Sequence, residues 1–221
     1  MTGTFITFEG IDGSGKSTQL RLLSNFLRVT GCDVLATREP GGTPVGVRLR
    51  AALLDADEEV DPLTELLVFA ADRAQHVRRV LRPALDRGSV VISDRYADAT
   101  VAYQGAGRGF SSQLISQIVE LATEGLRPNL TLLFDVSINE STTRTSRRSA
   151  KNKRDRLDIE DRNFHTRVRA AYMKIASSEP QRVKLIDTSG TVEETHEQVK
   201  QIVLPFLRAR GQFNRDHVAA E

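Results

Sequence analysis

The feature that most constrains this chain is a glycine-rich segment near its beginning, FEGIDGSGKST at residues 8–18. Gly10, Gly15, Lys16 and Ser17 have the spacing G-x-x-x-x-G-K-[ST] of a phosphate-binding loop. Glycines allow backbone N–H groups to approach phosphate oxygens, the lysine adds a positive charge, and the serine hydroxyl is a ligand for Mg²⁺. A helix that begins at the lysine would add its positive N-terminal dipole. The segment therefore predicts binding of a nucleoside triphosphate.

The sequence on both sides of the loop agrees with that prediction. A β-branched and aromatic run at 4–8 precedes it, and apolar residues at helical spacing follow until Gly31. A strand, a glycine loop and a helix form the arrangement in which this motif binds phosphate, and the alternative is a glycine-rich turn that binds nothing. The expected phosphate-binding residues are Gly10, Ile11, Asp12, Gly13, Ser14, Gly15, Lys16, Ser17 and Thr18.

Composition favours a globular cytoplasmic protein. The 221 residues suit one domain, and a net charge of only +2 provides no global field for nucleic acid or a membrane. The single cysteine, Cys32, excludes an internal disulfide and fits a reducing compartment. The N-terminus lacks the pattern of a signal peptide, and no apolar segment approaches the length that spans a bilayer. We therefore expect no nucleic-acid partner and no membrane partner.

Strand and helix patterns alternate along the chain. The helix that follows Asp61-Pro62 is expected to break near Pro83, because proline removes a helical hydrogen bond. The expected strands occupy residues 4–8, 33–37, 89–93, 130–136 and 183–187. This alternation predicts an α/β fold with a five-stranded parallel sheet flanked by helices on both faces. We expect one domain over residues 1–210 and a flexible tail over residues 211–221.

Segments with glycine or charged residues, which can bind a ligand, follow three of the expected strands. The glycine loop follows the first strand, Arg38-Glu39 follows the second, and Asp94-Arg95-Tyr96 follows the third. Because ligands gather at the carboxyl ends of parallel strands, these segments are expected to meet at one site. A carboxylate beside an arginine suits a cation and an anion, whereas the alternative is a buried structural ion pair.

The ordered set of motifs resembles the thymidylate kinase family, a group of P-loop kinases that act on a nucleoside monophosphate. The resemblance extends from Phe5 to about Leu207. The segments that carry it are FEGIDGSGKST at 8–18, REPGGT at 38–43, FAADR at 69–73, DRY at 94–96, AYQG at 102–105 and DRLD at 155–158. The resemblance implies transfer of phosphate from ATP to dTMP, a step in dTTP synthesis, with ATP as co-substrate and Mg²⁺ as cofactor.

The resemblance also implies roles for individual residues. Lys16 would hold the donor phosphates, Ser17 and Asp94 the metal, and Arg95 the acceptor phosphate. The implied dTMP-binding residues are Asp12, Glu39, Arg50, Phe69, Arg73, Arg95, Thr100, Tyr103 and Gln104.

Within the implied dTMP-binding set, three side chains have distinct tasks. Phe69 would stack on thymine, Arg73 would hydrogen-bond a base carbonyl, and Tyr103 would crowd the 2′ position of the sugar. Phe69 and Arg73 lie four residues apart and so share one helix face. The alternatives are that Phe69 and Tyr103 are packed core aromatics and that Arg50 is a solvated helix residue.

A basic segment over about residues 138–160 is expected to be a lid. From residue 144 to residue 156 it holds seven Lys or Arg residues and one Asp. Similar enzymes without a basic residue in the glycine loop take the catalytic arginine from the lid, and residues 11–14 contain none. Arg147 and Arg148 are the expected catalytic residues, followed by Arg144 and Arg156. The alternatives are a solvated charge run and an RNA-binding patch, although no aromatic residue interleaves the basic ones.

Two other functions stay open. One is a P-loop kinase for a different nucleotide or for a deoxynucleoside, and the other is a nucleic-acid-linked P-loop ATPase. Formation of ADP that depends on dTMP would separate them from a dTMP kinase. The resemblance also implies a homodimer that pairs through helices flanking the sheet.

Overall fold

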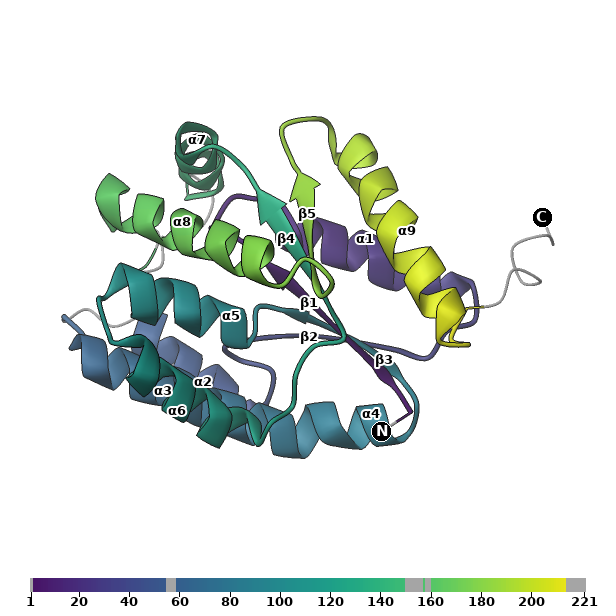
Figure 1. The fold of residues 1–221 in the computed structure, drawn as a ribbon, viewed down its shortest axis with the longest axis horizontal. Helices are drawn as coiled ribbons and strands as arrows, with labels where there is room; N and C mark the ends of the chain where they lie inside the picture. The colour runs from purple at the N-terminus through teal and green to yellow at the C-terminus, as the bar shows by residue number, and fades with distance from the viewer. Residues whose placement is uncertain (1, 55–58, 150–156, 158–159, 214–221) are drawn as a thin grey trace.

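A parallel sheet with helices on both faces forms the centre of the molecule (Figure 1). The structure is a computed structural model and describes residues 2–54, 59–149, 157 and 160–213. The strands are β1 (Thr4–Glu9), β2 (Val34–Arg38), β3 (Val90–Asp94), β4 (Leu130–Asp135) and β5 (Val183–Asp187). Their spatial order is β2-β3-β1-β4-β5, and every neighbouring pair is parallel. The five predicted strands are confirmed, with ends displaced by at most one residue.

Alternating side chains along the central strands make both faces of the sheet apolar. On one face, Ile6 and Phe8 of β1 pack against α1 (Lys16–Val29) and α9 (Val192–Ala209). On the other face, Phe5 packs against the long helical segment that precedes β3. The sheet is therefore covered on both sides, as the apolar strands predict.

Most of the remaining helices cover the face opposite α1 and α9 (Figure 1). In chain order, the helices outside α1 and α9 are α2 (Pro44–Leu54), α3 (Pro62–His76), η1 (Val77–Leu81), α4 (Arg82–Asp86), α5 (Ala97–Thr100), η2 (Val101–Gly107), α6 (Ser112–Thr123), α7 (Ile138–Ser149) and α8 (Arg162–Ser178). The segments η1 and η2 are π-helices. Within the described ranges, no helix has the length and apolar character needed to cross a membrane.

The predicted break near Pro83 is wrong. The helical chain continues from α3 through the π-helix η1 into α4, which ends at Asp86. Pro83 is the second residue of α4, so it lies where the wider turn of the π-helix η1 returns to the α-helical form. The cap at Asp61 is confirmed, because its Oδ1 accepts a 2.8 Å hydrogen bond from the N–H of Leu63.

The structure describes only part of the predicted lid and part of the predicted C-terminal tail. Residues 138–149 of the predicted lid form α7, whereas 150–156 and 158–159 lie outside the described residues. Packing continues beyond residue 210, because Phe213 is buried in the core beside α1 and Gln212 Nε2 donates a 2.9 Å hydrogen bond to Gly88 O. Residues 214–221 lie outside the description.

Candidate functional site

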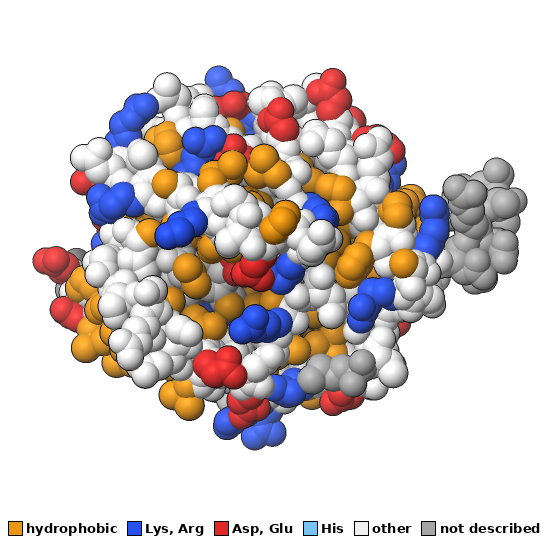
Figure 2. Space-filling view, in the orientation of Figure 1, with side chains coloured by type: hydrophobic (Ala, Val, Ile, Leu, Met, Phe, Trp, Pro, Cys, Tyr) orange, Lys and Arg blue, Asp and Glu red, His pale blue; other side chains and the backbone are white. Residues whose placement is uncertain are grey.

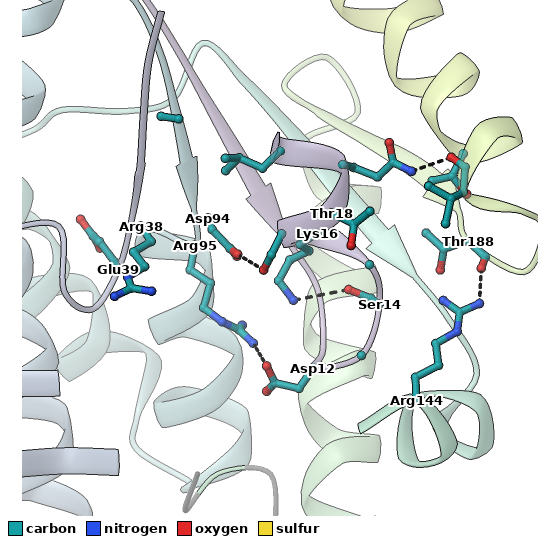
Figure 3. Close-up of a pocket in the computed structure, with 18 of the residues that line it drawn as sticks. Asp12, Ser14, Lys16, Thr18, Arg38, Glu39, Asp94, Arg95, Arg144 and Thr188 are labelled. Carbon is teal, nitrogen blue, oxygen red and sulfur yellow. Dashed lines mark hydrogen bonds and ion pairs between the residues drawn. The ribbon is translucent and has the colours of Figure 1, made fainter. Parts of the chain in front are cut away.

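The glycine loop connects β1 to α1 and opens toward the carboxyl end of the sheet (Figure 3). Gly10, Gly13 and Gly15 have positive φ values of 137°, 74° and 91°, which favour glycine. A Cβ on Gly10 would lie 2.3 Å from Phe134 O, so the loop also needs the small residue for its close approach to β4. Gly15 is the N-cap of α1, and the first turn of this helix therefore faces the cleft with free N–H groups.

Lys16 is the first residue of α1, and its side chain reaches back to the glycine loop. Its Nζ donates hydrogen bonds to Gly10 O at 3.0 Å and to Ile11 O at 2.9 Å. Burial, with a smaller contribution from the charge of Arg95, lowers the pKa of Lys16 to about 8, although Asp12 acts in the opposite sense. A polyanion bound in the loop would favour the charged form of the lysine, so binding of phosphate and protonation of Lys16 support each other.

A cleft of about 1190 Å³ surrounds the loop. Its lining includes the loop residues 12–18, Arg38 on β2, Arg144 on α7 and the segment around Thr188. Space of this size is suitable for a nucleotide. Seven of the nine predicted phosphate-binding residues, 12–18, therefore line one cavity, whereas Gly10 and Ile11 are buried and do not line it.

Ser17 and Asp94 form the predicted metal pair. Ser17 Oγ donates a 2.6 Å hydrogen bond to Asp94 Oδ2, which joins the first turn of α1 to the end of β3 (Figure 3). Hydroxyl and carboxylate oxygens are the ligands that Mg²⁺ prefers, and Mg²⁺ is commonly held by one or two protein oxygens together with substrate phosphates and water. Within the described residues no group of three His, Cys, Asp or Glu side chains forms a complete metal cage. The donor set therefore fits a metal that arrives with a nucleotide.

The Arg95 guanidinium lies beside the glycine loop and is held by four oxygen atoms. Nη1 donates to Gly10 O at 3.1 Å and to the Tyr172 hydroxyl at 3.3 Å. Nη2 donates to Asp12 Oδ1 at 2.8 Å and to the Tyr103 hydroxyl at 3.0 Å. Burial opposes ionisation of Asp12, but the charges of Arg95 and Lys16 outweigh it and lower the pKa of this carboxyl. The guanidinium is thus held in one orientation at the edge of the cleft.

The backbone of Arg95 is unusual as well. Its φ value of 71° lies in the left-handed region, which a residue with a Cβ adopts at a cost. Two hydrogen bonds hold it there: Arg95 N donates to Phe8 O at 2.9 Å, and Ser93 Oγ donates to Arg95 O at 2.8 Å. This turn directs the side chain back toward the loop, away from the course of β3.

A second, smaller cavity of about 70 Å³ lies next to the cleft. Its lining contains every residue of the predicted dTMP-binding set: Asp12, Glu39, Arg50, Phe69, Arg73, Arg95, Thr100, Tyr103 and Gln104. Asp12, Arg50 and Arg95 line the cleft too, so the two cavities adjoin at these residues. At this junction Arg50 Nη1 donates to Pro40 O at 3.2 Å.

Arg73 forms the buried wall of the smaller cavity. Its Nε donates to Glu39 Oε2 at 2.8 Å, Nη1 to Thr100 Oγ1 at 2.7 Å and Nη2 to Tyr96 O at 2.8 Å. Phe69 lies one turn earlier on α3 and is half-buried. A guanidinium carries five N–H groups, and hydrogen bonds to described residues occupy three of them, so two remain to meet a ligand.

Several residues around the site escaped the sequence analysis. Glu65 of α3 accepts a 2.8 Å hydrogen bond from Gln104 Nε2 and pairs with Arg108 at 2.8 Å. Glu65 lies four residues before Phe69 and eight before Arg73, so helical spacing places it on the same face of α3 and could have identified it. The remaining missed residues are Glu9, His76 and Tyr172, which contact site residues from segments distant in sequence.

The lid brings a different arginine to the cleft from those ranked first. Arg144 lines the cleft, and its Nη2 donates to Thr188 O at 2.7 Å and to Glu140 Oε1 at 2.5 Å (Figure 3). Arg147 is exposed on α7 and does not line the cleft. The side chain of Arg148, and Arg156 as a whole, lie outside the described part of the chain.

Comparison with known proteins agrees with the geometry. A sequence model of the family "Thymidylate kinase" matches residues 8–199. The thymidylate kinase of Deinococcus radiodurans is 48% identical over 197 residues, covering 89% of this chain and 94% of that protein. That of Pelobacter propionicus is 46% identical over 206 residues, covering 91% and 94%. The crystal structure of thymidylate kinase from Ehrlichia chaffeensis superposes with a TM-score of 0.75 at 35% identity, covering 91% of this chain and 98% of the other. This chain therefore belongs to the thymidylate kinase family.

Proposed function

We propose that this chain is a dTMP kinase that transfers the γ-phosphoryl group of ATP to dTMP. An oxygen of the dTMP phosphate forms the new bond to the γ-phosphorus, and the bond from that phosphorus to the β–γ bridging oxygen breaks. The products are dTDP and ADP. Phosphoryl transfer needs little covalent chemistry from a protein, because catalysis depends on alignment of the two phosphates and neutralisation of charge.

ATP is assigned to the large cleft, with its phosphates in the glycine loop. Backbone N–H groups of residues 12–18 and the N-terminus of α1 meet the phosphate oxygens. Lys16 exchanges its hydrogen bonds with the loop carbonyls for the outer phosphates. Ser17 and Asp94 would hold Mg²⁺, which when bound neutralises developing charge on the β and γ oxygens.

dTMP is assigned to the smaller cavity, with its phosphate at the junction of the two cavities. Arg95 and Arg50 supply positive charge there, and Arg95 is already oriented by its hydrogen bonds. Phe69 offers an aromatic face to the base, and Arg73 offers its two remaining N–H groups to a base carbonyl. We assign the exclusion of a ribose 2′-hydroxyl to Tyr103, because this residue lines the same cavity.

The transferring phosphoryl group needs a further cation, which we assign to α7. Arg144 is the first candidate because it lines the cleft. Arg147 and Arg148 are the second candidates and would act after a movement of α7. An arginine in this role is worth roughly 10³ to 10⁵ in rate in related chemistry.

The observation that carries this function is the adjacency of the two cavities, with Arg95 and Asp12 shared between them. A coupled assay for ADP, run with ATP and Mg²⁺ across dTMP, dUMP, UMP, AMP and thymidine, tests it. We expect no turnover without an acceptor, fast turnover with dTMP and much slower turnover with each of the other four compounds. ATP hydrolysis stimulated by DNA in the absence of dTMP would contradict the proposal and favour a nucleic-acid-linked ATPase.

We further propose a cytoplasmic homodimer. Leu63 and Leu67 of α3 and Leu121 of α6 are exposed apolar residues on helices that pack together, and Leu121 is 75% exposed. Hydrophobic side chains gather at the lower left of Figure 2, over the region where Figure 1 shows these helices. An apolar patch of this kind is typical of a surface that meets another protein. On the same face, basic and acidic side chains are interspersed, which is unlike a nucleic-acid-binding surface (Figure 2).

A further inference from the structure

Behind the smaller cavity lies a series of linked side-chain hydrogen bonds that do not themselves contact the reacting phosphates. Thr37 Oγ1 lies 2.8 Å from His76 Nε2, and His76 Nδ1 lies 2.8 Å from Glu39 Oε1. The other carboxyl oxygen, Glu39 Oε2, accepts the 2.8 Å hydrogen bond from Arg73 Nε. His76 is fully buried, and Glu39 and Arg73 are nearly so. The series therefore begins on β2 and ends at the guanidinium that faces the cavity.

The geometry makes Glu39 a link between the other two side chains. A carboxylate that met Arg73 through one oxygen alone would be free to rotate about its last bond. The His76 ring prevents this rotation, because it holds the second oxygen from the opposite side. The Arg73 plane is then fixed at Nε by Glu39, at Nη1 by Thr100 and at Nη2 by Tyr96 O.

The loop at Gly42 packs closely against the His76 ring. A Cβ on Gly42 would lie 2.5 Å from His76 Nε2 and 2.8 Å from Thr37 Oγ1, so the loop backbone presses directly on that hydrogen bond. The neighbouring Asp72 is tied to the same loop, because its Oδ1 accepts a 3.1 Å hydrogen bond from Gly41 N. The buried carboxyls of Asp72 and Glu39 stand close together, and burial raises the pKa of Asp72 to about 6, with the charge of Glu39 adding to the rise.

We propose that His76 is a positioning residue for base recognition, which fixes Glu39 and through it the orientation of Arg73. This inference rests on the proposed function, in which Arg73 meets a base carbonyl. Thymine has a carbonyl at position 4, where cytosine has an amino group. A fixed guanidinium donates to the carbonyl but would face the amino group donor against donor, which leaves buried polar groups unpaired. A guanidinium free to tilt would lose this discrimination.

Two substitutions of His76 separate its two hydrogen bonds. The amide nitrogen of asparagine stands two bonds from Cβ, as Nδ1 does, so His76→Asn keeps the donor to Glu39. The amide nitrogen of glutamine stands three bonds from Cβ, as Nε2 does, so His76→Gln keeps only the contact with Thr37. We expect the ratio of kcat/KM for dTMP over dCMP to stay within about twofold of wild type in His76→Asn. In His76→Gln it should fall about tenfold or more, the scale of a lost charge-assisted hydrogen bond.

Controls distinguish positioning from a purely structural role. His165→Gln on α8 repeats the substitution outside the site and should leave the ratio unchanged. In an Arg73→Ala background, His76→Gln should have no further effect on the ratio, because its route to the base is gone. A structural role would lower the melting temperature and the turnover of both nucleotides without a change in their ratio. If His76→Gln does not fold, Glu39→Gln carries the same test, since it weakens the link while leaving His76 in place.

The results separate this inference from the function on which it rests. One result would overturn the role of His76 alone. In it, the dTMP/dCMP ratio of kcat/KM falls in Arg73→Ala but stays at the wild-type value in His76→Gln, or in Glu39→Gln where that variant replaces it. Equal ratios in His76→Asn and His76→Gln would also overturn it. A wild-type ratio in Arg73→Ala would instead remove the proposed contact between Arg73 and the base.

Discussion

Tyr172 places its hydroxyl 3.3 Å from Arg95 Nη1 while donating a 2.8 Å hydrogen bond to Glu9 Oε2. The three side chains come from α8, the end of β3 and the end of β1. A buried carboxyl group on one strand thus supports, through a phenol, the guanidinium that is proposed to bind the acceptor phosphate. The orientation of Arg95 therefore depends on a helix distant from it in sequence.

Tyr172→Phe should weaken the acceptor site. Removal of the hydroxyl leaves Arg95 with one support fewer, and we expect the KM for dTMP to rise about tenfold while the KM for ATP changes little. Steady-state kinetics with each substrate varied in turn measures this. Tyr96→Phe is the matched control, because it removes a hydroxyl bonded to Leu126 O and leaves the four hydrogen bonds of the Arg95 guanidinium in place. Equal changes in the two KM values would contradict the prediction.

Asp94→Asn should impair use of the metal. The amide lacks the charge of the carboxylate, so we expect a fall in kcat of about 100-fold or more and a higher Mg²⁺ concentration for half-maximal rate. A titration of the rate with Mg²⁺ at saturating ATP and dTMP measures both. Asp135→Asn at the end of β4 is the control, since Asp135 pairs with Arg169. An unchanged Mg²⁺ dependence in Asp94→Asn would exclude a role in metal binding.

Arg144→Ala should slow the chemical step more than it weakens binding. The expected fall in kcat is about 10³-fold, with the Kd for ATP within a few-fold of wild type. Arg147→Ala and Arg148→Ala are compared with it under single-turnover conditions. A larger loss in Arg147→Ala or Arg148→Ala would assign the cation to that residue and indicate that α7 moves during the reaction. Normal turnover in all three would remove α7 from catalysis.

Glu9 should make stability depend on pH. Burial raises the pKa of Glu9 from an ordinary value of 4.5 to about 8, and the charge of Asp98 adds to the rise. The folded protein therefore keeps a proton that the unfolded chain releases, so this group destabilises the fold as pH increases from 4.5 to 8. Glutamine does not titrate. The free energy of unfolding of wild type relative to Glu9→Gln should fall by a few kcal/mol across that window, as measured by urea denaturation. A difference that is independent of pH would contradict this.

Leu67→Glu and Leu121→Glu should separate the proposed homodimer. Each places a charge in the apolar patch of α3 and α6, where burial in an interface would be costly. Light scattering after size exclusion should give a dimer for wild type and a monomer for both variants. Val29→Glu is the control, because Val29 is 87% exposed on α1, away from these helices. A monomeric wild type would refute the interface.

Local patterns were enough to predict the part of the site that is local in sequence. The glycine loop and the residues after β3 follow from spacing and from the position of strand ends, because a phosphate site is made largely of backbone. The five strands followed from runs of apolar residues. Membership of the acceptor pocket came from the resemblance of residues 69–73 and 102–105 to a family, and the structure places those residues around one cavity.

Contacts between distant segments could not be predicted in this way. Tyr172 stands at helical spacing from Val168, which indicates a shared helix face and nothing more, although its hydroxyl reaches Arg95 across the site. The π-helix η2 carries Tyr103 and Gln104, but a sequence with two glycines shows no helical periodicity. The role of α7 could not be predicted either. The packing of α7 beside Thr188 decides which of its arginines faces the cleft, and this packing is a contact between distant segments.

At Arg95, the left-handed backbone conformation disfavours a residue with a Cβ, whereas phosphate binding needs the arginine side chain. A residue with a Cβ pays about 1–3 kcal/mol to adopt such a conformation, whereas glycine adopts it freely. Arg95→Gly would relieve the strain at the end of β3 and abolish the guanidinium that the acceptor phosphate needs. The same change removes the ion pair with Asp12 and the hydrogen bonds to Gly10 O and the Tyr103 hydroxyl, so the relief of backbone strain is opposed by a carboxyl that loses its cation.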